Sequence, residues 1–291
     1  MRRSTKFKHK HPPTVAYTPE SVLRHPQRML REMWRDLLAS RELAWRLLVR
    51  DISAKYRQSF LGFFWAIIPA IVTAAGFTLA KNNGIVNIGT TDLPYPAYVM
   101  FSMTLWQTFI EALNAPMQGV TAGKAMLARI NFPREALILS KLGEVFFNFG
   151  VKLILVIALF IWFKMPVSAS IILAPVALIH LIALGTFIGL MLAPIGFLYQ
   201  DVARIITLAT SFLLFLTPVV YPVPTDGMFS NIVHINPVTP LLVTTRELAT
   251  TGTISDPIGF WVASGISFVG LFFAWIIYRV SMPYIVERIS S

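Results

Sequence analysis

Charged and amide side chains recur at helical spacing inside an apolar part of this sequence. Steps of three, four and four place one set on a single stripe of a helix: Lys141, Glu144, Asn148 and Lys152. A second stripe in an earlier apolar stretch consists of Thr104, Thr108, Glu111, Gln118 and either Asn114 or Ala115. A charge at the centre of a bilayer costs about 2.5–3.5 kcal/mol, so both stripes should face protein or water. Either they line a translocation path, or they join helices through a pair such as Glu111 or Glu144 with Lys152.

Aromatic side chains are frequent beside these stripes. Sugar rings present apolar C–H faces that stack on aromatic rings, so an aromatic-lined conduit would suit a glycan, although aromatic residues are equally ordinary in membrane packing. Our candidates for a substrate path combine both kinds of residue: Trp106, Phe109, Glu111, Phe146, Phe149 and Lys152.

The sequence contains no residue set with the spacing of a catalytic or metal site. The chain has no cysteine, which excludes disulfides, thiolate metal sites and cysteine nucleophiles, and its five histidines are scattered. The nearest approach to a phosphate-binding loop is Gly119–Ala125. It has three residues between its glycines where a Walker loop has four, and Ala125 follows the lysine in place of Ser or Thr. We therefore expect no enzymatic activity, no metal and no ATP bound by this segment.

The composition indicates what must position these residues. Of 291 residues, 55% are hydrophobic and only 13% charged, about half the charged share of a soluble domain. Fourteen of the 25 Lys and Arg residues lie in residues 1–58, together with only five of the 14 acidic residues. The sequence therefore predicts an integral membrane protein with a basic cytoplasmic tail over residues 1–28, and we expect membrane lipids rather than nucleic acid as partners of this region.

The apolar segments predict an all-α, polytopic fold with six transmembrane helices over residues 60–280. A span needs about 20 mostly apolar residues. Six segments qualify: Leu61–Ala80, Tyr95–Met117, Leu137–Phe163, Ile171–Leu198, Val202–Val223 and Ile258–Tyr278. With both termini cytoplasmic, 21 basic residues lie inside and three outside, which agrees with the positive-inside rule. Residues 281–291 are expected to be a cytoplasmic tail.

Three shorter features complete the organisation. Residues 29–59 have an amphipathic pattern typical of one interfacial helix, or two in tandem, that is either a docking or gating element or a plain membrane anchor. Only three residues separate the fourth and fifth segments, which predicts a tight helical hairpin at Tyr199–Asp201. The external connection that follows contains Pro240–Leu248, which has the character of a short external or re-entrant helix.

Two motifs make the chain recognisable. The first runs from Arg50-Asp51 through Lys55-Tyr56-Arg57 and Leu61-Gly62 to Trp65 and Pro69; the second runs from Leu105-Trp106 through Lys124, Met126-Leu127 and Arg129 to Phe132-Pro133-Arg134-Glu135. Both resemble the first spans of ABC-2 type permeases that export polysaccharides such as O antigen, capsule or teichoic acid. The resemblance covers about residues 40–280. One departure is Gln200, where the family often has arginine.

The resemblance implies a transport subunit of the bacterial inner membrane. In such exporters two permease copies pair with two copies of a separate ABC ATPase, which carries the ATP and Mg, and the substrate is an undecaprenyl-pyrophosphate-linked glycan. It implies that the ATPase-coupling residues are Lys124, Arg129, Phe132, Pro133, Arg134 and Glu135. It also implies that Arg50, Lys55 and Arg57 lie near the lipid-linked pyrophosphate, which they can hold by charge-assisted hydrogen bonds; snorkelling to phospholipid is the alternative role for these three side chains. The alternative function is an ABC-2 permease for a drug or small lipid.

Overall fold

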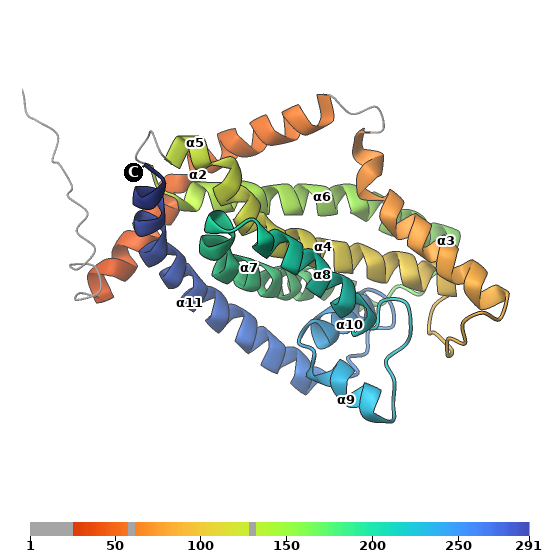
Figure 1. Ribbon diagram of the computed structural model, residues 1–291. Helices are drawn as coiled ribbons and strands as arrows, with labels where there is room; N and C mark the ends of the chain where they lie inside the picture. The colour runs from red at the N-terminus through yellow and green to blue at the C-terminus, as the bar shows by residue number, and fades with distance from the viewer. Residues whose placement is uncertain (1–25, 58–61, 128–131, 291) are drawn as a thin grey trace, which may run out of the picture.

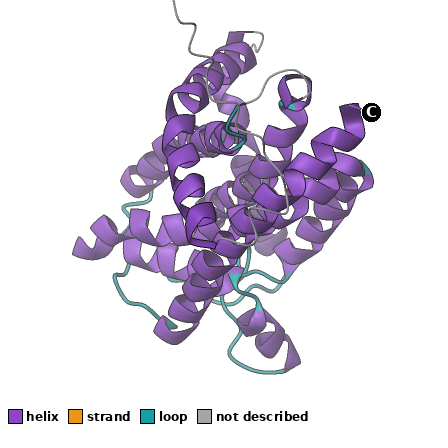
Figure 2. Cartoon of the chain, turned by 90° about the vertical axis from the view of Figure 1, so that its left-hand side faces the viewer, coloured by secondary structure: helices purple, strands orange, loops and turns teal. Residues whose placement is uncertain are grey.

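The computed structural model describes residues 26–57, 62–127 and 132–290, and in this part of the chain all regular elements are helices (Figure 2). In chain order they are α2 (Pro26–Arg57), the 3₁₀ helix η1 (Gly62–Ala66), α3 (Ile68–Asn82), α4 (Tyr95–Ala122), α5 (Lys124–Leu127), α6 (Glu135–Trp162), the 3₁₀ helix η2 (Ala169–Leu173), α7 (Ala174–Leu198), α8 (Asp201–Phe215), α9 (Met228–Ile235), α10 (Val238–Ala249) and α11 (Pro257–Ser290). The predicted all-α class is confirmed.

Three of these helical segments are long and apolar enough to cross a membrane: Glu135–Trp162, Ala169–Leu198 and Pro257–Glu287. They correspond to the third, fourth and sixth predicted spans. The predicted count of six spans is not settled by length and composition, and it stays a prediction.

Helix α7 lies between α4 and α11 and forms the centre of the bundle (Figure 1). Its Gly185 and Gly189 allow the backbones of α7 and α4 to approach closely. A Cβ added at Gly185 would lie 2.7 Å from the carbonyl oxygen of Phe109, and one at Gly189 would overlap the carbonyl oxygen of Leu113. Small residues four apart permit this kind of helix contact in membranes, so this glycine face belongs to the core.

Helix α2 is one continuous helix, not two in tandem, and it packs on α6 and reaches the C-terminal part of α11 (Figure 1). Its buried face carries Met33, Ala44 and Leu47, whereas Trp34 and Trp45 are exposed on the outer face. This division confirms the amphipathic pattern of residues 29–57; Gln58 and Ser59 lie outside the described residues. The predicted tail, residues 1–28, is described only from Pro26 onward.

The structure changes three of the predicted boundaries. The first predicted span is divided into η1, which begins at Gly62 with a positive φ of +48°, and α3, which begins only at Ile68, next to Pro69. The fifth predicted span ends early, at Phe215, three residues before Pro218, whose missing N–H group weakens a helix at this point. Residues 281–290, expected to be a tail, instead continue α11 as a helix.

The segment after α8 is held by side chains from the N-terminal part of α4. The Tyr95 hydroxyl donates to the Val220 carbonyl (2.9 Å), and the Tyr98 hydroxyl donates to the Tyr221 carbonyl (2.8 Å). Helices α9 and α10 gather at this end of the bundle, away from the C-terminus (Figure 1). Helix α10 confirms the short helix predicted at Pro240–Leu248, and nearly all of its residues are buried. The predicted hairpin is also confirmed, because α7 ends at Leu198 and α8 begins at Asp201.

Candidate functional site

A buried ion pair joins α4 and α6 near the middle of both helices. The Lys152 ammonium donates to a carboxylate oxygen of Glu111 (2.6 Å), and the Asn148 amide donates to the other (3.3 Å). The Lys152 side chain is 1% exposed and the Glu111 side chain 31% exposed. A buried charge is tolerable only when it is paired and hydrogen-bonded, and this geometry meets that condition for Lys152. Thr108 lies 3.5 Å from the same ammonium.

A second set of charges joins α2 to α6 one to three turns earlier along α6. Lys141 donates to Asp51 (2.9 Å) and to Glu144 (2.9 Å), while Lys55 donates to the other oxygen of Glu144 (3.0 Å). The predicted α6 stripe is therefore paired along its whole length: its first half with α2, its second half with α4. Burial raises the pKa of the Asp51 carboxyl, but the hydrogen bonds from Lys141 and Arg50 outweigh this effect and hold the pKa below its ordinary value.

The three residues predicted to lie near a pyrophosphate occupy the last two turns of α2. Arg50, Lys55 and Arg57 are all exposed. Arg50 pairs with the neighbouring Asp51 (2.8 Å) and Lys55 with Glu144. Three exposed cations at one helix end form a surface that attracts anions, whether phospholipid or pyrophosphate.

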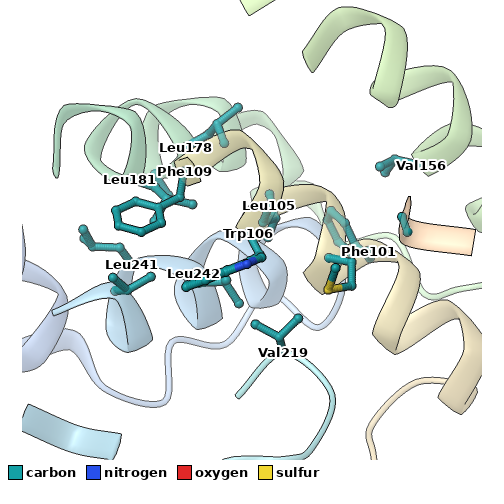
Figure 3. Close-up of a cluster of buried hydrophobic side chains, with 14 of the residues drawn as sticks. Phe101, Leu105, Trp106, Phe109, Val156, Leu178, Leu181, Val219, Leu241 and Leu242 are labelled. Atoms are coloured by element: carbon teal, nitrogen blue, oxygen red, sulfur yellow. The ribbon is translucent and has the colours of Figure 1, made fainter. Parts of the chain in front are cut away.

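The aromatic path candidates are divided between the core and the surface. Trp106 and Phe109 contact each other, with ring centroids 5.5 Å apart, and are 5% and 0% exposed. Figure 3 shows Phe109 among Leu178, Leu181 and Leu241, and Trp106 beside Leu242. Both rings therefore pack inside the chain, between α4, α7 and α10.

On α6, Phe149 is half-buried and Phe146 is 49% exposed. Of the six predicted path residues, the structure thus brings Trp106 together with Phe109, and Glu111 together with Lys152. It does not gather the aromatic residues around one opening.

The predicted coupling residues run from Lys124, at the start of α5, to Glu135, at the start of α6. Lys124 is exposed and lies 5.7 Å from the ring centre of Phe197. Phe132, Pro133 and Arg134 are half-buried, and Arg129 lies outside the described residues.

Glu135, the last of these predicted residues, is buried and takes part in a joint of three helices. Its carboxylate accepts from Arg279 of α11 (3.0 Å), and the other end of that guanidinium donates to Asp36 of α2 (2.7 Å). The Trp275 indole N–H also donates to Glu135 (3.4 Å).

Sequence reasoning missed this joint and one further buried cation. Asp36 and Arg279 are 243 residues apart, so no local pattern connects them. Arg246 of α10 is buried over the Tyr98 ring at 4.1 Å and donates to Ser102 (2.7 Å) and to the Pro218 carbonyl (3.3 Å). The signal in the sequence was the helical character of Pro240–Leu248, which identified a helix but not the burial of Arg246.

No group of three metal-binding side chains occurs among the residues that the structure describes. A helical bundle with several apolar helices, a buried ion pair between two of them and an amphipathic helix docked across their ends defines a multi-pass membrane protein. Residues 42–248 match the ABC-2 type transporter family, and the chain belongs to that family.

The similarity extends to bacterial permeases. The chain is 24% identical to the O-antigen export system permease protein RfbA of Myxococcus xanthus over 221 residues, which cover 74% of this chain and 82% of the relative. Two proteins of the same name from Klebsiella pneumoniae are 20% and 22% identical over 211 and 214 residues, in each case 71% of this chain and 79% of the relative.

Proposed function

We propose that this chain is the permease subunit of an ABC exporter that moves a lipid-linked polysaccharide of the O-antigen type across the bacterial inner membrane. The observation that carries the proposal is the family match over residues 42–248, together with three relatives that are O-antigen export permeases. The Arg-Asp motif at Arg50 and the Phe-Pro-Arg-Glu motif at Phe132 favour a glycan over a drug or small lipid.

The proposal is tested by depleting the chain in its host and measuring lipid-linked glycans by mass spectrometry. Because the polymer would still be made but not exported, an undecaprenyl-linked glycan should build up inside the cell. An unchanged glycan pool, in a strain without a second exporter, contradicts the proposal.

In the proposed exporter, two copies of this permease assemble with two copies of a separate ABC ATPase, and both termini lie in the cytoplasm. ATP and Mg bind to the ATPase, not to this chain. The exposed Lys124 and the turn that precedes α6 support a contact with the ATPase at this end of the bundle. Glu135 would support the turn from within, through its bond to Arg279.

The coupling role is tested by charge reversal. Arg134→Glu or Arg129→Glu should abolish export and ATP-dependent coupling while the protein still inserts. Lys164→Glu, at the opposite end of α6, is the control. Normal export in both coupling variants would contradict an ATPase contact at these residues.

A further inference from the structure

Within the described residues, one side of α4 is only partly covered by other helices in its C-terminal half. Residues spaced three and four apart bring polar side chains to this side; Glu111 and Asn114 are half-buried, and Gln118 is exposed. Ala112, Leu113 and the three residues that follow Asn114 are buried. We call these three polar residues, Glu111, Asn114 and Gln118, the Glu111 stripe.

The lengths of the neighbouring helices explain why this side of α4 is exposed. Helix α7 covers one side of α4 at Gly185 and Gly189, and α6 covers a second at Lys152 and Asn148. Helix α3 also packs on α4, but it has 15 residues against the 28 of α4. At a rise of about 1.5 Å per residue it reaches along only about half of α4. The loop after Asn82 starts that contact at the N-terminal end of α4, so the Glu111 stripe lies beyond it.

The chemistry of the stripe favours a sugar over lipid, because lipid cannot solvate a carboxylate and two amides. Asn and Gln also join helices in membranes, so a second copy of the chain is the alternative occupant that the crosslinking experiment below tests. Amides donate and accept hydrogen bonds, and a carboxylate accepts them, which together match the hydroxyl groups of a sugar.

The stripe lies next to the cations at the end of α2. Lys55 binds Glu144 of α6, and Asn148, four residues later on α6, binds Glu111. Four residues correspond to about 6 Å along a helix. A pyrophosphate held by Lys55 and Arg57 would thus have its attached sugar within reach of Glu111.

Resting on the function proposed above, we infer that the Glu111 stripe is the hydrogen-bonding wall that receives the sugars next to the lipid pyrophosphate as the glycan enters the permease. Lys152 is a positioning residue. It is buried and binds one carboxylate oxygen of Glu111, Asn148 binds the other, and the Glu111 side chain remains 31% exposed.

Photo-crosslinking in the complete transporter tests which molecule covers the stripe. A benzoylphenylalanine side chain at position 118 should form an adduct that carries the glycan. The same side chain at Ile157 is the control, because Ile157 is exposed on the side of α6 opposite Asn148. An adduct with a second copy of the chain at position 118, or lipid adducts alone at both positions, overturns the inference.

A charge swap separates sugar recognition from simple helix pairing. Glu111→Gln should lower export about tenfold, the size expected for one hydrogen bond to a charged group. The double variant Glu111→Lys/Lys152→Glu restores an ion pair between α4 and α6 but removes the exposed carboxylate, so its membrane level should be normal and its export still about tenfold low. Full export by the double variant would show that the pair only joins helices.

Both results are distinguishable from failure of the proposed function. Depletion of the wild-type chain tests whether a glycan is exported at all. If depletion causes glycan build-up but the stripe variants export normally, the proposed function stands and the inference is wrong.

Discussion

The α4–α7 interface and the joint between α2, α6 and α11 stabilise the same bundle by different means. In the first, two glycines of α7 let backbone pack against backbone over a buried apolar cluster. In the second, one guanidinium, Arg279, binds carboxylates of two other helices. Close packing is insensitive to pH and salt, whereas ion pairs depend on both. From this difference we expect the α4–α7 frame to withstand changes of pH and salt that weaken the docking of α2.

The largest effect should come from filling the glycine contact. Gly189→Val places side-chain atoms against the Leu113 carbonyl and should force α7 away from α4. We expect a loss of at least about 3 kcal/mol, the upper range for overpacking, seen as loss of the monodisperse protein in detergent. Gly265→Val is the matched control, since no atom lies within 4 Å of an added Cβ there. If the two variants unfold alike, close α4–α7 packing is not what stabilises the centre.

The second effect should come from removing Arg279. Arg279→Met leaves Asp36 and Glu135 without this partner and should cost about 2–3 kcal/mol, somewhat less than for a fully buried pair. Limited proteolysis should cut α2 faster while the α4–α7 core stays intact. Equal protection of α2 in the variant and the wild type would contradict a contribution of these ion pairs to the docking of α2.

A smaller, pH-dependent effect should come from Asp51. Its lowered pKa means that the ionised carboxylate stabilises the docked α2 at pH values above the ordinary value of 3.8. This contribution is lost as the pH falls below 3.8 and through the lowered value. Acid should therefore increase proteolysis near the end of α2, and Asp51→Asn should remove this part of the acid response. If Asp51→Asn and the wild type respond to acid alike, a group other than Asp51 causes the acid response.

The smallest effect is expected at an exposed pair. Arg204 and Asp201 interact at 3.2 Å, but both side chains are largely in solvent or headgroups. Arg204→Gln should change the unfolding free energy by less than about 0.5 kcal/mol in a thermal melt. A larger loss would mean that an exposed pair on α8 also stabilises the bundle.

The sequence predicted those parts of the structure that depend on local spacing. The α6 stripe from Lys141 to Lys152 is continuous in the structure, and the Glu111–Lys152 pair is one of the two pairings that the spacing allowed. The amphipathic division of α2 and the hairpin at Tyr199–Asp201 also follow from short-range pattern and length.

Parts that depend on packing between distant segments were not predictable in the same way. Helical spacing places Phe109 on a particular side of α4, but the burial of that side depends on α7 and α10, which come much later in the chain. Hydropathy favoured a longer fifth span, whereas the hydrogen bonds of Tyr95, Tyr98 and Arg246 hold the segment after Phe215 in a non-helical form.

The joint at Arg279 also has a consequence for biosynthesis. Asp36 leaves the ribosome 243 residues before its partner. At about 5–20 residues per second, α2 exists for roughly 12–50 s before α11 supplies the guanidinium. During this interval α2 lacks its ion pair with α11, and the exposed Trp34 and Trp45 can hold the helix on the lipid surface. The last helix to be made therefore completes the docking of the first. A nascent chain truncated before Arg279 would contain all six predicted spans but lack the ion pairs that hold α2 to α11.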